Sequence, residues 1–271
     1  MAPAGPAVDD AFYQPGGSGP DGHRYLSTPL TAGPWDPGAQ HAGPPIALVA
    51  TAIERDHPRG DARVVRVTAD ILRPVPVAPV IVTTTLAGPG RGAELLTGSL
   101  SARGRQVLAV RAWRIRILPD SDPAPQIPDG PPPPGPDSGH HDPYLVRSRR
   151  GYLAAMEWRF LTGAFNQPGP ATAWLRMRHP LIAGEDPTPL ARVLVAADSG
   201  NGVSSVLPFA RWRFINPDLT VCLHRMPVGE WICLDAATTV DPAGVGLATS
   251  IISDTDGVVG RGLQSLYVGA R

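Results

Sequence analysis

The strongest constraint on the fold is that the second half of the chain repeats the first. When the 271-residue sequence is aligned with itself so that Thr68 meets Thr220, similar residues also meet further along the two halves. The other matched pairs are Arg73 with Arg225, Gly92 with Gly244, Leu95 with Leu247, Thr97 with Thr249, Leu100 with Ile252, Ser101 with Ser253 and Val107 with Val259. Such agreement in a single register is hard to produce by chance. The sequence therefore predicts two copies of one structural unit.

Each half contains one long helix among several strand-like stretches. In the first half we expect a strand at 23–30, a helix at 44–57 and strands at 63–72, 77–86, 94–102 and 107–117. In the second half we expect a helix at 187–198 and strands at 152–165, 173–178, 210–214, 219–224, 231–239, 246–253 and 260–268. The strands after each helix follow one another directly, without the strand–helix alternation of parallel sheets. This pattern predicts an α+β fold.

Composition divides the chain into four segments. Residues 1–22 are rich in Pro, Gly and Asp and are expected to be flexible, with an anchor at Phe12 and Tyr13. Residues 119–143 include a run of prolines and few apolar residues, so we expect an exposed, semi-rigid connection. The folded units are then 23–118 and 144–271. His140 and His141 lie beside Asp142 in the connection, where a solvated loop is a better interpretation than a metal site.

Charge and cysteine content exclude several functional classes. The 24 basic residues, all of them Arg, balance 24 acidic residues, so no basic excess is present to bind nucleic acid. Cys222 and Cys233 fall in strand-like runs and are expected to be buried thiols in a reducing cytoplasm. The first residues lack the basic and apolar regions of a signal peptide, and no apolar run could span a membrane. We therefore expect a cytoplasmic protein without a cofactor or a metal.

An acidic residue closes the helix expected in the second half. Asp186 can cap this helix, and Pro187 suits its first turn. Asp198 falls in the last turn, before Gly200. A carboxylate there lies at the negative end of the helix dipole, which disfavours its charge. Chains tolerate this position where water screens the acid or where the acid has chemistry to perform.

The order of elements resembles the hotdog fold, in which an antiparallel sheet wraps around a central helix. Two fused copies resemble the double-hotdog acyl-CoA thioesterases, the family that includes bacterial thioesterase II. The resemblance covers nearly the whole chain and rests on the order and spacing of four motifs. These are Gln40-His41-Ala42-Gly43-Pro44-Pro45, Asp198-Ser199-Gly200-Asn201-Gly202, the stretch from Phe214 through Asn216, Asp218 and Thr220 to His224-Arg225, and Arg261-Gly262-Leu263-Gln264.

The resemblance implies hydrolysis of acyl-CoA to free acid and CoA by a water molecule that three side chains hold. In the family these are an Asp after the second helix, a Ser or Thr on the next strand and a Gln on the last strand. Asp198 and Gln264 match two of these positions, whereas the hydroxyl position falls on Asn216. Asp218 and Thr220 follow closely enough to share its role. The candidate catalytic residues are therefore Asp198, Asn216, Thr220 and Gln264.

Backbone groups at the start of the first helix are candidates for binding the thioester. N–H groups near Gly43 would stabilise the oxyanion, and glycine would let the substrate approach the backbone. The candidate substrate-binding residues are His41, Gly43 and Asp218. Each candidate also has a plain interpretation: Asp198 as a solvated helix-end acid, Gln264 as an outward polar residue, Asn216 as a turn residue and His41 as a satisfied loop histidine.

Two other functions stay open at this stage. One is a protein of the same fold that binds acyl thioesters without hydrolysing them, which the Asn at 216 allows. The other is a hotdog dehydratase or hydratase, which we rank low because no His lies between His179 and His224 to accompany Asp198. The substrate would be an acyl-CoA or an acyl-carrier thioester. A homo-oligomer is also open, because hotdog sheets usually pair and this chain already supplies one such pair.

Overall fold

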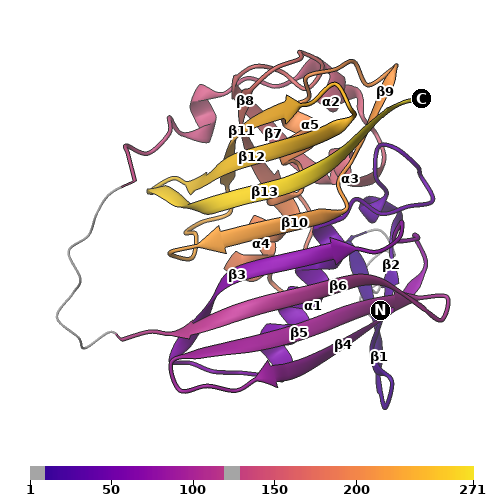
Figure 1. Ribbon diagram of the computed structural model, residues 1–271, viewed down its shortest axis with the longest axis vertical. Coiled ribbons are helices and arrows are strands. Elements are labelled where there is room, and N and C mark those ends of the chain that lie inside the picture. The colour runs from indigo at the N-terminus through magenta and orange to yellow at the C-terminus, as the bar shows by residue number, and fades with distance from the viewer. Residues whose placement is uncertain (1–9, 119–128) are drawn as a thin grey trace, which may run out of the picture.

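Antiparallel strands form one continuous sheet that runs through both halves of the molecule (Figure 1). The computed structural model describes residues 10–118 and 129–271. The first half comprises β1 (Tyr13–Gly19), β2 (Gly22–Ser27), η1 (Pro29–Thr31), α1 (Gly43–Asp56), β3 (Ala62–Ile71), β4 (Pro79–Gly88), β5 (Ala93–Ala102) and β6 (Arg105–Arg116). The second half comprises η2 (Pro136–Ser138), α2 (Pro143–Arg147), α3 (Gly151–Ala155), β7 (Met156–Thr162), β8 (Ala171–Met177), α4 (Pro189–Ala197), α5 (Gly200–Val203), β9 (Trp212–Ile215), β10 (Asp218–Leu223), β11 (Ile232–Val240), β12 (Val245–Asp254) and β13 (Gly257–Ala270).

The order of the strands repeats between the two halves. From its outer edge the first half runs β1-β2-β4-β5-β6-β3, and the second runs β7-β8-β11-β12-β13-β10, while β9 pairs with β13. The halves meet where β3 pairs with β10. Thr68 lies opposite Thr220 there, and the flanking pairs, Asp70 with Asp218 and Arg66 with Cys222, are symmetric about it. The alignment that matches Thr68 with Thr220 thus corresponds to a local two-fold axis through this pair.

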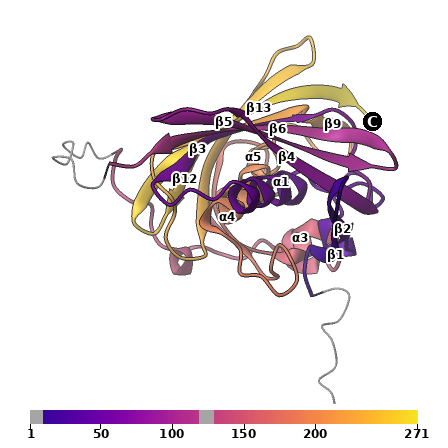
Figure 2. The same cartoon turned by 90° about the horizontal axis from the view of Figure 1, so that it is seen from below.

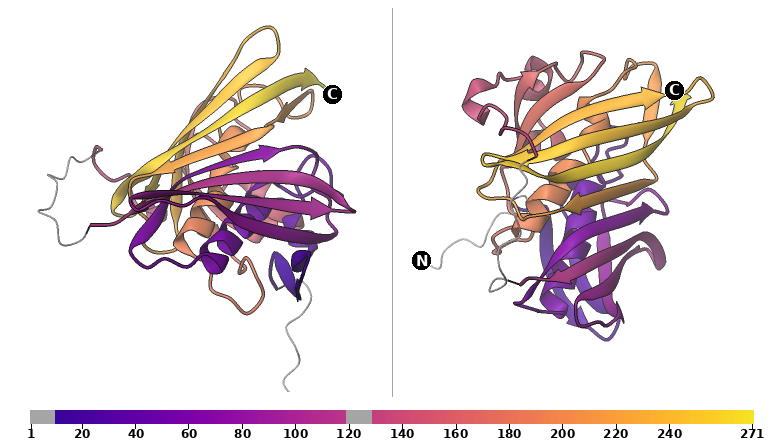
Figure 3. Two further views of the ribbon diagram at one scale, coloured as in Figure 1. Left: turned by 60° about the horizontal axis from the view of Figure 1, so that its bottom comes forward. Right: turned by 60° about the vertical axis from the view of Figure 1, so that its left-hand side comes forward.

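The sheet curves around α1 and α4, which lie side by side in its hollow (Figures 2 and 3). Both helices are mostly apolar, and most residues of each are buried, apart from the charged last turn of α1. A helix with this composition is stable only when other elements surround it. Here the sheet covers one side of each helix and the neighbouring helix covers another. The expected α+β class with an antiparallel sheet is confirmed.

Three local expectations differ from the structure. Residues 13–19 form β1, so this part of the N-terminal segment is a strand where flexibility was expected, whereas Phe12 and Tyr13 are fully buried, as an anchor would be. Their backbone N–H groups donate to carbonyls at 180 and 181, which ties this hairpin to the second half.

Helix α4 begins at Pro189, because Thr188 and not Asp186 accepts the capping hydrogen bond, from Ala191 N at 3.2 Å. Residues 151–155 are helical, not extended. Residues 1–9 of the segment expected to be flexible lie outside the described residues.

The described part of the Pro-rich connection, 129–143, runs over the surface. Most of its residues are exposed, and Trp174 Nε1 donates to the carbonyl of Pro134 at 2.8 Å. Asp142 differs, because it is buried and caps α2 through Tyr144 N at 2.8 Å. His141 Nδ1 lies 2.9 Å from a guanidinium nitrogen of Arg159. The rest of the expected connection, 119–128, lies outside the described residues.

The two cysteines have different surroundings. Cys233 is buried, as expected, and burial raises the pKa of its thiol to about 12. Cys222 is exposed, so the expectation of two buried thiols is wrong for this residue. It alternates with Val221 and Leu223, whose side chains point to the core. Among the described residues, no helix combines the length and apolar character that crossing a membrane requires.

Candidate active site

The carboxylate of Asp198 lies at the junction of the two halves and is almost completely buried, with 3% of its side chain exposed. Its Oδ2 atom lies 2.9 Å from Gly43 N and 2.9 Å from His41 Nδ1. Its Oδ1 atom lies 2.8 Å from Asn216 Nδ2 and 3.1 Å from Gln264 Nε2. A buried carboxylate is costly unless polar partners replace its water. Here four nitrogen atoms from three separate segments replace it.

Asp198 caps the first helix from the other half of the chain. Gly43 is the first residue of α1, and the preceding Ala42 has no side chain that can cap. The Gly43 N–H therefore donates to Asp198, which places the acid at the positive end of the α1 dipole. The favourable interaction of the carboxylate with the N-terminus of α1 offsets its unfavourable interaction with the C-terminus of α4, where Asp198 is the C-cap residue.

Glycine at position 43 is required by the contact between the two helices. A Cβ atom there would lie 2.5 Å from the carbonyl oxygen of Val195 and 3.1 Å from its Cα. The expectation that Gly43 serves the substrate therefore needs correction. Its N–H is bound to Asp198, and the backbone that approaches it closely is that of α4.

Gln264 and Asn216 fix one side of the carboxylate. Gln264 lies on the inner face of β13, and its Oε1 accepts from Asn201 N at 3.0 Å while its Nε2 donates to Asp198. Gly200 packs closely on this region, because a Cβ at that position would lie 2.6 Å from Ser250 Oγ and 3.1 Å from Gln264 Oε1. Asn216 donates from Nδ2 to Asp198 and to the carbonyl of Asp218 at 3.2 Å. Within the described parts of the chain, its Oδ1 atom has no hydrogen-bond partner.

An aromatic ring that the sequence did not single out holds His41. The rings of His41 and Tyr152 stack with their centroids 3.7 Å apart and an angle of 8° between their planes. The Tyr152 hydroxyl donates to the carbonyl of Val195 at 2.7 Å and lies 2.8 Å from Ser199 Oγ. Burial raises the pKa of Tyr152, so its hydroxyl stays protonated. In the sequence, the glycine before Tyr152 indicates a turn at this point. In the structure, Gly151 starts α3 with φ at 68°.

Two of the candidate residues lie outside this cluster. Thr220 alternates along β10 with the buried Leu219 and Val221, and its hydroxyl donates to Thr68 Oγ1 at 3.3 Å. Asp218 accepts from Ser265 N at 2.9 Å and so fastens β10 to β13. The structure thus brings together Asp198, Asn216, Gln264, His41 and Gly43, but not Thr220 or Asp218.

The first half lacks an equivalent cluster at the corresponding positions. Val64 and Ala112, both buried, occupy the positions that match Asn216 and Gln264. Two acids lie near the end of α1: Asp56 accepts from the Thr84 hydroxyl at 2.6 Å, and Glu54 accepts from the hydroxyl of Thr188 at the start of α4 at 3.1 Å. Burial raises the pKa of Glu54. Glu54 therefore has a hydroxyl as its partner, whereas Asp198 has the side-chain amides of Asn216 and Gln264.

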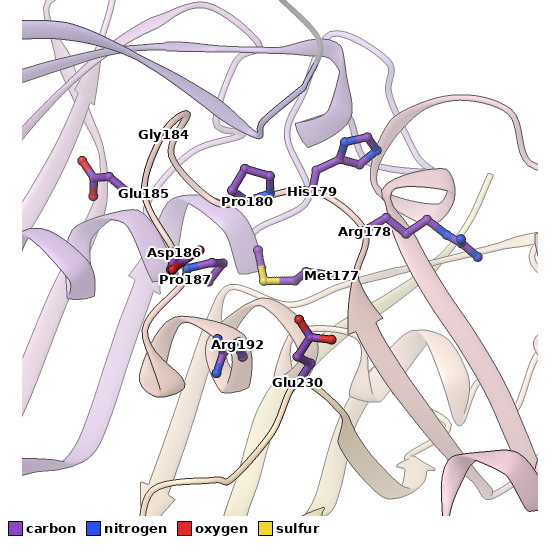
Figure 4. Close-up of a pocket in the computed structure, with 10 residues that line it drawn as sticks. All are labelled: Met177, Arg178, His179, Pro180, Gly184, Glu185, Asp186, Pro187, Arg192 and Glu230. Carbon is purple, nitrogen blue, oxygen red and sulfur yellow. The ribbon is translucent and has the colours of Figure 1, made fainter. Parts of the chain in front are cut away.

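One surface cavity lies away from this cluster. It has a volume of about 490 Å³ and lies beside the start of α4, whereas Asp198 lies beyond the other end of that helix. Figure 4 shows Met177 near its centre, with Pro180 and Pro187 on one side and Glu230 on the other. A second cavity of about 290 Å³ is lined by residues that include Leu153. Because neither cavity is lined by Asp198, the cluster itself and not the cavities defines the candidate site.

Comparison with known proteins assigns the chain to a family. Two family models match it, the acyl-CoA thioesterase N-terminal domain over residues 31–115 and the acyl-CoA thioesterase C-terminal domain over residues 122–268. Among curated proteins, no sequence is similar enough to count as a match.

Solved structures show the same fold. A hot dog fold protein of unknown function from Alicyclobacillus acidocaldarius has a TM-score of 0.70 and 16% identity, over 93% of this chain and 95% of that one. Acyl-CoA thioesterase II TesB2 from Mycobacterium marinum has a TM-score of 0.63 and 14% identity, over 92% of each chain. The likeness shows that the chain has the hotdog fold. The family models cover most of the sequence, and they confirm the resemblance that its motifs suggested. The chain belongs to the acyl-CoA thioesterase family.

Proposed function

We propose that this protein hydrolyses acyl-CoA thioesters to a free acid and CoA, with water activated beside Asp198, Asn216 and Gln264. The observation that carries the proposal is the meeting of these three side chains, from α4, the β9–β10 loop and β13, at one buried carboxylate. Thioester hydrolysis needs a group that removes a proton from water and polar groups that hold the reacting atoms in place. A fixed carboxylate with two amides and an imidazole supplies both kinds of group.

A thiol-release assay tests the proposal directly. Purified protein is supplied with acyl-CoA substrates from acetyl-CoA to long acyl chains, and the freed CoA is measured with a thiol reagent. We expect turnover with at least one range of chain lengths. Release no faster than in buffer for every substrate would contradict the proposal.

One observation favours the alternative of a thioester-binding protein without hydrolytic activity. Residue 216 is an Asn, so no hydroxyl contacts Asp198 from that position. Calorimetry separates the two functions, because a binding protein would take up acyl-CoA without releasing thiol.

We also propose that the chain consists of two hotdog units, β1–β6 with α1 and β7–β13 with α4, joined through 119–143. The repeated order of strands and the pairing of Thr68 with Thr220 support this division. The first unit then begins at β1, earlier than residue 23, because β1 is the counterpart of β7.

Replacing Gln264 with Ala is expected to lower kcat/KM by roughly tenfold, less than the roughly 100-fold or more expected for a group that transfers a proton. Gln264 acts by holding Asp198 and the Asn201 backbone in position. Steady-state kinetics measure the effect, and Ser265→Ala is the control, because the exposed side chain next to Gln264 lies outside the cluster. Equal activity in the two variants would contradict this role.

Replacing Asn216 with Thr is expected to keep kcat/KM within about threefold of wild type or to raise it. A Thr hydroxyl can donate to Asp198 as the Asn amide does, and it restores the group that the family has at this position. Asn216→Ala serves as the comparison, because it removes the donor and should lower activity. A loss in Asn216→Thr as large as that in Asn216→Ala would show that the amide itself is required.

A further inference from the structure

All acceptor positions of the Asp198 carboxylate are already in use. A carboxylate has about four lone-pair positions for hydrogen bonds. Four nitrogen atoms, those of Gly43, His41, Asn216 and Gln264, lie 2.8–3.1 Å from its two oxygens. A water molecule could donate to this carboxylate only by displacing one of the four nitrogen atoms. The displaced N–H group would then be a buried donor without a partner. Asp198 is therefore poorly placed to bind the hydrolytic water itself.

The geometry assigns the tautomer of His41. Its Nδ1 atom lies 2.9 Å from Asp198 Oδ2, a distance at which two acceptors would repel each other. The Gly43 N–H is closer to Oδ2, at 2.9 Å, than to Nδ1, at 3.4 Å, so it does not supply the proton between them. The proton therefore lies on Nδ1 and is donated to the carboxylate. The Nε2 atom is then left with a lone pair.

The lone pair of Nε2 is accessible and its direction is fixed. Within residues 10–118 and 129–271, no hydrogen-bond partner contacts Nε2, and 13% of the His41 side chain is exposed. The ring stacks on Tyr152, and the edge-on contact of Tyr152 with Trp158, at 6.2 Å and 83°, holds that ring in turn. A ring fixed by stacking on one face and by a carboxylate at Nδ1 is preorganised for proton transfer at Nε2.

We propose that Nε2 of His41 is the general base of this site and that Asp198 orients it, an inference that rests on the proposed thioesterase function. The water oxygen forms a bond to the thioester carbonyl carbon while one water proton moves to Nε2. The tetrahedral intermediate then collapses, the C–S bond breaks, and the proton on Nε2 passes to the departing sulfur. The products are the acid and CoA thiol. The carboxylate of Asp198 stabilises the imidazolium between these two steps.

Substitutions of His41 distinguish the role of Nδ1 as a donor from the role of Nε2 as a base. In His41→Asn the amide N–H can replace Nδ1–H as a donor to Asp198, but the base is lost. We expect kcat/KM to fall by about 100-fold or more. His57→Asn is the matched control, because His57 lies outside the cluster and contacts Thr84, and it should keep wild-type activity. Added imidazole should raise the rate of His41→Ala by about tenfold or more and leave the wild-type rate unchanged.

The outcomes distinguish this inference from the proposed function. An active wild type together with a folded and fully active His41→Asn would overturn the role of His41 alone. A wild type that hydrolyses no acyl-CoA would overturn both. Nitrogen-15 NMR of the wild type gives a readout that does not depend on activity. At about pH 8, where free imidazole is neutral, we expect a proton on Nδ1 and none on Nε2. A proton on Nε2 would overturn the assignment.

Discussion

Asp198→Asn should lower kcat/KM for acyl-CoA hydrolysis by about 100-fold or more, because a neutral amide cannot stabilise a positive charge on His41 or accept all four hydrogen bonds. One oxygen becomes an NH2 group and faces N–H donors that it cannot satisfy. Initial rates at saturating and at low acyl-CoA measure the effect. Glu54→Gln is the matched control, because Glu54 is an acid in the last turn of α1 that accepts from the Thr188 hydroxyl and lies outside the Asp198 cluster. Full activity in folded Asp198→Asn would mean that this acid has only a structural role.

The same variant should also lose stability, although the C-terminal end of α4 by itself disfavours a charge at position 198. The structure shows that the carboxylate caps α1 and that four nitrogen atoms lie 2.8–3.1 Å from its oxygens. We therefore expect the free energy of unfolding to fall by about 2–3 kcal/mol. Urea unfolding measures this loss, and rates are to be compared under conditions in which both proteins are folded.

Gly43→Ala should be strongly destabilising, with a loss in the free energy of unfolding of about 3 kcal/mol. The added methyl would lie 2.5 Å from the Val195 carbonyl oxygen, so α1 and α4 must separate. This movement would also pull the Gly43 N–H and His41 away from Asp198, and hydrolysis should fall by about tenfold or more. Chemical unfolding and kinetics measure the two effects.

The control for this change is Gly60→Ala. A Cβ atom at Gly60 would meet no heavy atom within 4 Å, so the substitution adds the same methyl group in open space. It should alter the free energy of unfolding by less than about 0.5 kcal/mol. If the two substitutions had equal effects, close helix packing at Gly43 would not be the reason for its glycine.

Much of the fold is predictable from the sequence because its signals are local. Stretches rich in residues that favour strands indicated β3 to β6, and an apolar stretch that begins at Pro44 indicated α1. The alignment of Thr68 with Thr220 located the symmetry axis. The sequence also indicates that Thr220 does not belong to the site. Leu219 and Val221 on either side of it are apolar, so in a strand the Thr220 side chain points away from the core.

The arrangement of the site was only partly predictable because its contacts are distant in sequence. Asp198, Asn216 and Gln264 were selected by their place in the motifs, and the structure brings them together. The use of the Gly43 N–H could not be predicted, because its partner is 155 residues away. The start of α4 was misplaced for a different reason. Both Asp186 and Thr188 precede a proline, and only the folded geometry decides which side chain reaches a backbone N–H.

The cap that Asp198 places on α1 has a consequence for biosynthesis. Chains emerge from the ribosome N-terminus first, so the first half is complete long before Asp198 appears. Until then, the Gly43 N–H lacks its partner, and the α1 surface that packs on α4 is exposed. Docking of the second half covers this surface, caps the helix and assembles the polar cluster in one event. A chain that lacks the second half therefore has neither the Asp198 cap on α1 nor the assembled polar cluster.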